Sequence, residues 1–217
     1  MDPRQLDLLA QEHSLHGMGL GIRQRDHFYI AALALLISLA LVWRIGFRHD
    51  LLLAVATSIF WTKLLFPLIL AMVALGAWRM TLHPGFQHRA SGWLIATCIA
   101  SFWFVSLAVV LPTDRQALMA ELFGTSWQEC MAYIALHSLP MTACLLWISR
   151  RYGVLCPVDC GFFSGLSAGC IAASLYAVHC REPGLLFLGS WYVLGAFVPA
   201  LAGASMGRVL LTWRMQD

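Results

Sequence analysis

The sequence contains little charge. Only 12% of its 217 residues are Asp, Glu, Lys or Arg, whereas soluble domains carry about 25%. Hydrophobic residues make up 60% of the chain, and a soluble chain of this size buries only roughly 70% of its unfolded surface. This composition excludes a soluble monomer, a disordered chain, a coiled coil and a secreted disulfide scaffold. It predicts an all-α protein that crosses a membrane several times and contacts its lipids.

Features of several other protein classes are also missing. The basic residues are spread along the chain and the net charge is only +3, so no direct nucleic-acid binding is expected. The apolar runs contain no carboxylates in their interiors, which disfavours the ion relay of a transporter. No Cys-x-x-Cys pair is present, which disfavours a membrane thiol-disulfide oxidoreductase, and we expect no enzyme. The oxidoreductase and a small metal transporter stay open as alternatives.

Six apolar runs are long enough to cross a bilayer, because a span needs about 20 residues at a rise of 1.5 Å each. They cover about residues 28–47, 51–80, 91–111, 130–148, 159–179 and 185–213. The second run is too long for one straight span, so we expect its first third to tilt or to lie along the interface. Residues 1–27 form a polar tail in which we expect no cleavable signal peptide, and residues 28–213 form the transmembrane domain.

The basic residues predict the orientation. An even number of spans puts both termini on one side, and cytoplasmic termini place nine of the 14 basic residues inside and five outside, in agreement with the positive-inside rule. Arg44 and Arg48, at the outer end of the first span, go against this rule, and Asp50 could pair with one of them. Lys63 lies near the outer end of the second span, where we expect its side chain to extend to the interface.

Glycines recur at steps of four in the last two spans. Steps of four place residues on one helix face, where small side chains let two backbones approach closely. Such faces are typical of ordinary packing within one chain, and they also occur in homodimers, so both interpretations are open. The glycines concerned are Gly161, Gly165, Gly169, Gly195, Gly203 and Gly207.

Two of the seven cysteines differ from the others in their position. Cys130 opens the fourth span and Cys180 closes the fifth, and because these consecutive helices are antiparallel, both thiols reach the outer membrane face. A reversible disulfide forms there if the Cα atoms lie within about 7 Å. Glu129, His179 and Glu182 flank the pair and could complete a transient site for a soft metal. Two unpaired cysteines at the interface are the alternative.

The second half of the chain carries a set of short motifs. They are Trp127-x-x-Cys130, Ser138-Leu139-Pro140, Tyr176-Ala177-Val178-His179-Cys180 and Trp191-Tyr192. Together they resemble the NrsF family of six-span anti-sigma factors of the bacterial inner membrane, over about residues 27–214. The resemblance implies a sigma factor of the extracytoplasmic-function, sigma-F type as partner and no resident cofactor. It also implies that metal or oxidative stress releases this partner through two periplasmic cysteines, matched here by Cys130 and Cys180.

Two segments depart from the family pattern. Residues 181–184 contain fewer acids, and the N-terminal tail has a less regular apolar stripe. Sequestering a sigma factor requires an interface of more than about 1,000 Å², which a short tail alone hardly supplies. We therefore expect contacts from both the tail and the inner loops. The expected contact residues are Leu6, Leu8, Leu9, Arg79, Arg150 and Arg151.

Overall fold

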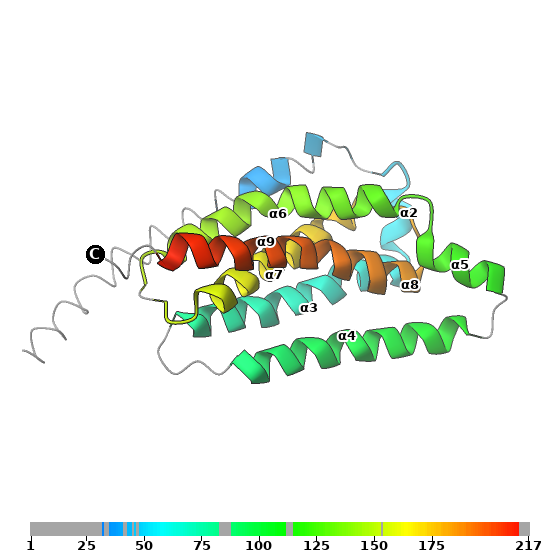
Figure 1. Ribbon diagram of the computed structural model, residues 1–217. Helices are drawn as coiled ribbons and strands as arrows, with labels where there is room; N and C mark the ends of the chain where they lie inside the picture. The colour runs from blue at the N-terminus through cyan, green and yellow to red at the C-terminus, as the bar shows by residue number, and fades with distance from the viewer. Residues whose placement is uncertain are drawn as a thin grey trace, which may run out of the picture.

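The part of the chain that the computed structural model describes is all-helical. It comprises residues 32, 35–40, 43–44, 46, 48–82, 88–111, 115–152 and 154–212. The long helices lie side by side along one direction (Figure 1). In chain order the helices are α2 (Leu51–Val55), α3 (Ser58–Thr81), α4 (His88–Val110), α5 (Arg115–Phe123), α6 (Trp127–Ser149), α7 (Pro157–Tyr176), α8 (Leu185–Phe187), the π-helix η1 (Leu188–Tyr192) and α9 (Val193–Thr212).

Five helical segments are long and apolar enough to cross a membrane. They are Ser58–Thr81, Ala90–Val110, Leu118–Ser149, Pro157–Tyr176 and Leu185–Leu211. They correspond to the second to sixth predicted spans. The first predicted span, 28–47, lies mostly outside the described residues, although residues 35–40 and 43–44 are helical. The first span, and with it a total of six spans, therefore stays a prediction, as do the cytoplasmic termini and the separate tail 1–27.

The beginning of the second predicted span is a separate short helix. Helix α2 ends at Val55, and Thr57 is extended, with φ −98° and ψ 142°, before α3 begins. The sequence predicted this different course for the first third of the run. The segment 112–129, between the third and fourth predicted spans, contains a further helix, α5. The sequence did not predict it because its nine residues are too few for a span.

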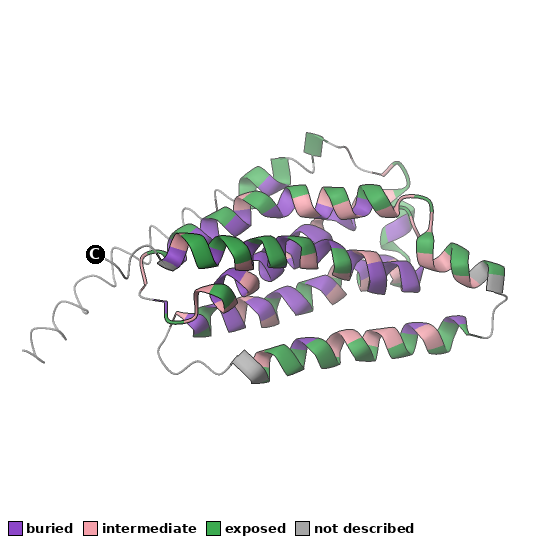
Figure 2. Ribbon diagram, in the orientation of Figure 1, coloured by how far each residue is buried: buried purple, intermediate pink, exposed green. Residues whose placement is uncertain are grey.

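Helix α7 lies at the centre of the bundle and α4 at its edge. In α7, 72% of the residues in the apolar window are buried, against 17% in α4, and Figure 2 shows this contrast between the two helices. The serines of α7 donate to carbonyls one turn back in the same helix; Ser164, for example, donates to Cys160 O at 2.7 Å. Because these hydroxyls are satisfied locally, α7 can be enclosed on nearly all sides.

Helices α7 and α9 pack through the predicted glycine faces. A Cβ atom on Gly161 would lie 2.0 Å from the carbonyl oxygen of Gly203, and one on Gly165 would lie 1.9 Å from that of Pro199. Only glycine permits this approach, so these faces serve packing within one chain. Gly195 instead faces Ile134 of α6. The glycine faces of α7 and α9 are thus covered, and a homodimer would need another surface.

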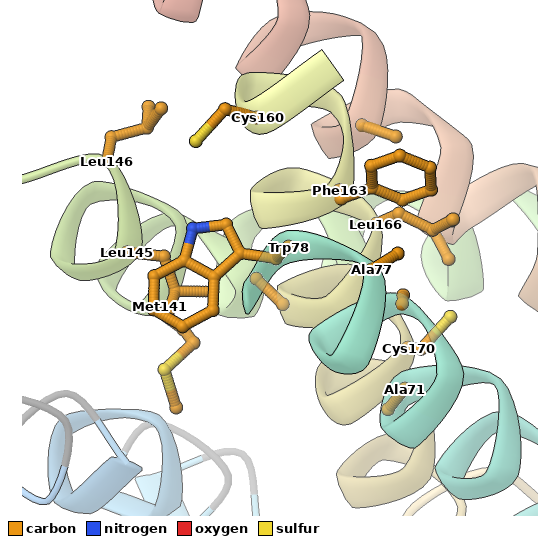
Figure 3. Packing of buried hydrophobic residues seen from close by; sticks show 14 of the residues in the cluster. Ala71, Ala77, Trp78, Met141, Leu145, Leu146, Cys160, Phe163, Leu166 and Cys170 are labelled. Carbon is orange, nitrogen blue, oxygen red and sulfur yellow. The ribbon is translucent and has the colours of Figure 1, made fainter. Parts of the chain in front are cut away.

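Helices α3, α6 and α7 also meet in a buried core near the ends that carry Arg79 and Arg150. Trp78 of α3 lies beside α6 there, close to Cys160 (Figure 3). Its indole Nε1–H donates to Ser149 Oγ at 2.9 Å, and the Cys160 thiol donates to the same oxygen at 3.3 Å. Cys160, at the start of the predicted span 159–179, lies in the first turn of α7 and is fully buried.

Candidate functional site: the cysteine cluster

The two cysteines singled out by the sequence lie in one buried cluster, which we call the cysteine cluster. Both are free thiols, Cys130 with 0% and Cys180 with 2% of its surface exposed. The cluster lies at the bundle end where α6 begins and α7 ends, which we call the cysteine end. Its members are Cys130, Ile134, Ala172, Ala173, Tyr176, Ala177, Cys180, Phe187, Leu188 and Tyr192.

A tight turn after α7 brings Cys180 into this cluster. The backbone N–H groups of His179 and Cys180 both donate to Tyr176 O, at 2.9 and 3.0 Å. The chain therefore folds back directly beneath the end of α7, while Cys130 enters from the first turn of α6. We expected the two thiols at the membrane face. Instead they are covered, because the segment that follows Cys180 packs over them.

The covering segment is the π-helix at the start of the last span. The wider π turn directs Leu188 and Tyr192 into the cysteine cluster, and both are essentially unexposed. The indole of Trp103 in α4 donates to the carbonyl of Gly189 at 3.1 Å. The indole of Trp191 donates to Leu122 O in α5 at 2.7 Å. Single π turns of this kind are frequent at functional sites, and here one joins α4 and α5 to the cysteines.

Lys63 of α3 is a member of this site that the sequence did not predict. We expected its side chain to extend to the interface, but only 2% of it is exposed. Its ammonium group lies 3.7 Å from the sulfur of Cys180 and also donates to the backbone carbonyl of Glu182. The prediction was wrong because the turn at 180–182 supplies partners inside the protein. Those partners are more than 100 residues away in the sequence.

Arg48 holds the same turn from another side. Its guanidinium donates to Cys180 O at 3.2 Å and binds both carboxylate oxygens of Asp50, at 2.8 and 2.6 Å. The expected pairing of Asp50 with a nearby arginine is confirmed. The hydrogen bonds from Arg48 lower the pKa of Asp50 to about 2, and those same bonds raise the pKa of Arg48.

Glu182 joins this turn to the connection between α5 and α6. Its Oε1 accepts hydrogen bonds from the backbone N–H and the hydroxyl of Thr125, at 2.8 and 2.6 Å, and from the Ser126 hydroxyl at 3.1 Å. Partial burial alone would raise the pKa of Glu182. The hydrogen bonds from Thr125 and Ser126, with the charge of Lys63, outweigh it and leave the pKa below its usual value.

The structure does not assemble the expected soft-metal set. Glu129 is exposed on α6, His179 Nδ1 lies 2.9 Å from Gly46 O, and the Glu182 carboxylate is occupied by the hydrogen bonds described above. Within the described part of the chain, no three His, Cys, Asp or Glu residues lie close enough to hold a metal. Adjacency in sequence suggested ligands, but the turn directs these side chains to different partners.

The expected sigma-contact residues that are described lie at the opposite end of the bundle, which we call the arginine end. Arg79 is in the last turn of α3 and exposed, and Arg150 follows α6 and is exposed. Arg151 places its guanidinium 4.1 Å from the ring centre of Trp147, a cation–π contact. The other three, Leu6, Leu8 and Leu9, lie outside the described residues.

Comparison with known proteins identifies the family. The family model described as "Negative regulator of sigma F" (NrsF) matches residues 21–213. The chain belongs to the NrsF family. A protein of Azospira oryzae named "Probable anti-sigma-F factor NrsF" is 33% identical over 183 residues, 84% of each chain. "Anti-sigma-F factor NrsF" of Caulobacter vibrioides is 34% identical over 168 residues, 76% of this chain and 78% of the relative. No solved structure matches the chain.

The motifs that carried the NrsF resemblance also build the cysteine cluster. Trp127 stacks on Trp191, with 4.6 Å between ring centres. Tyr176 contributes the carbonyl that closes the turn before Cys180. Tyr192 is part of the cluster itself. Three of the four motifs therefore contribute to one structural site, at the cysteine end, whose surroundings include Lys63 and Arg48 from outside those motifs. The fourth motif, at 138–140, lies further along α6.

Proposed function

We propose that this chain is an inner-membrane anti-sigma factor that binds an extracytoplasmic-function sigma factor of the sigma-F type. A metal or oxidant that acts on Cys130 and Cys180 releases the sigma factor. Membership of the NrsF family and the names of the two relatives support a regulatory rather than a catalytic role. The positive-inside rule assigns the arginine end to the cytoplasm, where a sigma factor is available.

One observation carries this proposal: the same two helices connect the thiols with the arginine end. Helix α6 begins beside Cys130, and α7 ends at the turn that carries Cys180. At the other end the two helices meet again, where Cys160 donates to Ser149, the residue before Arg150. A change in the spacing of α6 and α7 at the thiols would therefore reach the expected sigma-contact residues.

Burial of the thiols explains why their modification would move the helices. Protein interiors are close-packed, so a group added to either sulfur needs space that the cluster lacks. A bond between the two sulfurs would instead draw α6 and the turn after α7 together. The resulting state must bind the sigma factor less tightly than the resting state. A 100-fold loss of affinity corresponds to about 2.7 kcal/mol, which is within the range that overpacking of a core supplies.

The test replaces each thiol by a hydroxyl. We expect Cys130→Ser and Cys180→Ser each to repress the sigma factor as the native chain does and to lose the response to metal or oxidant. A sigma-dependent reporter in cells measures both properties, and differential alkylation of Cys130 and Cys180 follows their thiol state. Cys98→Ser in α4 is the control, and it should respond normally. Normal induction in both test variants would refute the sensing role of the pair.

A further inference from the structure

A cavity opens beside the cysteine cluster. It has a volume of about 230 Å³, room for several water molecules at about 30 Å³ each. The loop before α2, the junction of α2 and α3, and the turn at 181–183 form its walls. Its lining includes three basic side chains, from Arg48, Lys63 and Arg181, and two acidic ones, from Asp50 and Glu182.

Lys63 connects this cavity with Cys180. It lines the cavity, it is 2% exposed, and its ammonium group contacts the Cys180 sulfur. Lys63 is also the only lysine in the sequence. The second atom that it contacts is a backbone carbonyl oxygen, that of Glu182. Neither a thiol nor a carbonyl carries a full negative charge. Among the described residues no carboxylate forms an ion pair with this buried ammonium, although the charge of Glu182 interacts with it from further away.

The acids of the cavity are engaged elsewhere. Asp50 binds Arg48 with both carboxylate oxygens, and Glu182 accepts its hydrogen bonds from Thr125 and Ser126. The Arg48–Asp50 pair is neutral as a whole, and Glu182 keeps its negative charge because its donors are neutral. Lys63 and Arg181 therefore leave the cavity lining with one net positive charge. The first turn of α3, whose cap residue Thr57 makes no side-chain cap hydrogen bond, also faces the cavity and adds a weak positive potential.

We propose that this cavity binds small, water-soluble anionic solutes that react with thiols, and that Lys63 guides them to Cys180. The inference deepens the proposed function, because it names the chemical class that reaches one of the sensing thiols. The anionic group of the solute rests near Lys63 and Arg181, and its electrophilic atom faces the Cys180 sulfur. Cys130, enclosed by Ile134, Tyr176 and Phe187 of the cluster, is reached only afterwards.

Charged methanethiosulfonate reagents test this inference directly. The thiolate of Cys180 forms a disulfide with the sulfenyl sulfur of the reagent, the S–S bond of the reagent breaks, and methanesulfinate leaves with the electron pair. The thiol proton passes to the buffer. The sulfonatoethyl reagent is anionic and the trimethylammonioethyl reagent is cationic, and both transfer a group through the same chemistry. The rate of labelling is read for each cysteine by peptide mass spectrometry of the purified full chain.

The measured quantity is the labelling rate by the anionic reagent divided by the rate by the cationic reagent, taken at Cys180 and then divided by the same ratio at Cys156. We expect this normalised preference to be at least about tenfold, since charged clefts raise association rates by this order. Cys156 serves as the internal reference because it is half-exposed and lies at the arginine end. Lys63→Met should abolish the preference, and Lys63→Arg should retain it. Arg181 is exposed, so we expect the Arg181→Gln variant to fold normally. It should reduce the preference by several-fold.

A lipid headgroup offers the same anionic chemistry, so the experiment is done in nanodiscs of phosphatidylcholine with and without phosphatidylglycerol. Equal preference in both supports a soluble solute, whereas protection of Cys180 by phosphatidylglycerol alone would assign the cavity to a headgroup and overturn the proposal. Equal normalised rates for the two reagents would also overturn it. These labelling rates do not depend on sigma release. If the labelling preference is absent but Cys180→Ser still loses the response to metal or oxidant, the cavity proposal fails and the proposed function remains.

Discussion

Glu182 illustrates how single side chains hold the cysteine end together. It lies two residues after Cys180, and its carboxylate is bound by Thr125 and Ser126 in the connection before α6. Gly124 precedes these residues with φ +53°, and a Cβ there would lie 2.8 Å from the Glu182 carboxyl. Glycine is thus required both by the backbone conformation and by the close approach. The arrangement links the segment that follows Cys180 to the segment that precedes Cys130 through an ionised carboxylate.

The ionised state of Glu182 predicts a pH dependence of stability. Its pKa is lower in the folded chain than its ordinary value of 4.5, so it stabilises the fold above that value and loses this contribution as the pH falls through the folded pKa. We expect Glu182→Gln to cost about 1 kcal/mol at neutral pH, the typical net value of such hydrogen bonds. Its thermal unfolding midpoint should also fall less steeply than that of the native chain between about pH 5 and pH 3.

Thermal unfolding of the purified chains in detergent, followed by circular dichroism, provides the measurement. Asp50 also has a lowered pKa, so the Glu182→Gln variant should keep part of the pH dependence. Identical slopes in the native and variant chains would show that the Glu182 carboxylate is not ionised in the way the hydrogen bonds indicate.

Among the helices, the pair α7 and α9 determines how rigidly the bundle transmits a change. The two backbones touch through Gly161 and Gly165 on one side and Gly203 and Gly207 on the other. Contact between backbones leaves no side chain that could rotate to absorb a displacement. We therefore expect a shift at the cysteine end to pass along α7 as a whole, as the proposed release of the sigma factor requires.

Alanine scanning of the glycines tests this contact. We expect Gly165→Ala to destabilise the fold by on the order of 2–3 kcal/mol, because its Cβ would lie 1.9 Å from the Pro199 oxygen and force the helices apart. Gly76→Ala on α3 is the matched control, since nothing lies within 4 Å of the added Cβ. It should be neutral or slightly stabilising. The thermal unfolding midpoint of each variant in detergent is the measurement. An equal effect of both substitutions would contradict the tight α7–α9 contact.

For the whole molecule, the important property is the separation of the two ends. The cysteine end holds the thiols, and the arginine end holds Arg79, Arg150 and Arg151. Five described segments can cross a membrane, and a first span over about residues 28–47 would make six. With six spans, the tail and the last residues share the arginine side.

Reporter fusions measure this orientation. A fluorescent protein joined after residue 217 or before residue 1 should fluoresce as cytoplasmic proteins do, and alkaline phosphatase inserted at residue 113 should be active in the periplasm. The positive-inside rule is the reason for this expectation. Active phosphatase after residue 217 would show an odd number of spans or the reverse orientation, and would put the thiols on the cytoplasmic side.

The sequence by itself determined the class of protein, the approximate spans from the second to the sixth, the family and the identity of the two thiols. These properties depend on composition and on local patterns: long apolar runs must become helices in lipid, since every backbone polar group has to be satisfied internally. The glycine steps also predicted a close helix contact, because periodicity fixes which residues share a face. Each of these inferences needs only neighbouring residues.

Only the tertiary structure decided which partners the polar side chains have. It buried Cys130 and Cys180 beneath the π-helix, directed Lys63 to Cys180 rather than to the interface, and engaged Glu182 with Thr125. It also showed that the glycine faces meet within one chain. These contacts join residues from about 40 to more than 100 positions apart. No local pattern encodes them, because they arise when the packing of whole helices brings distant segments together.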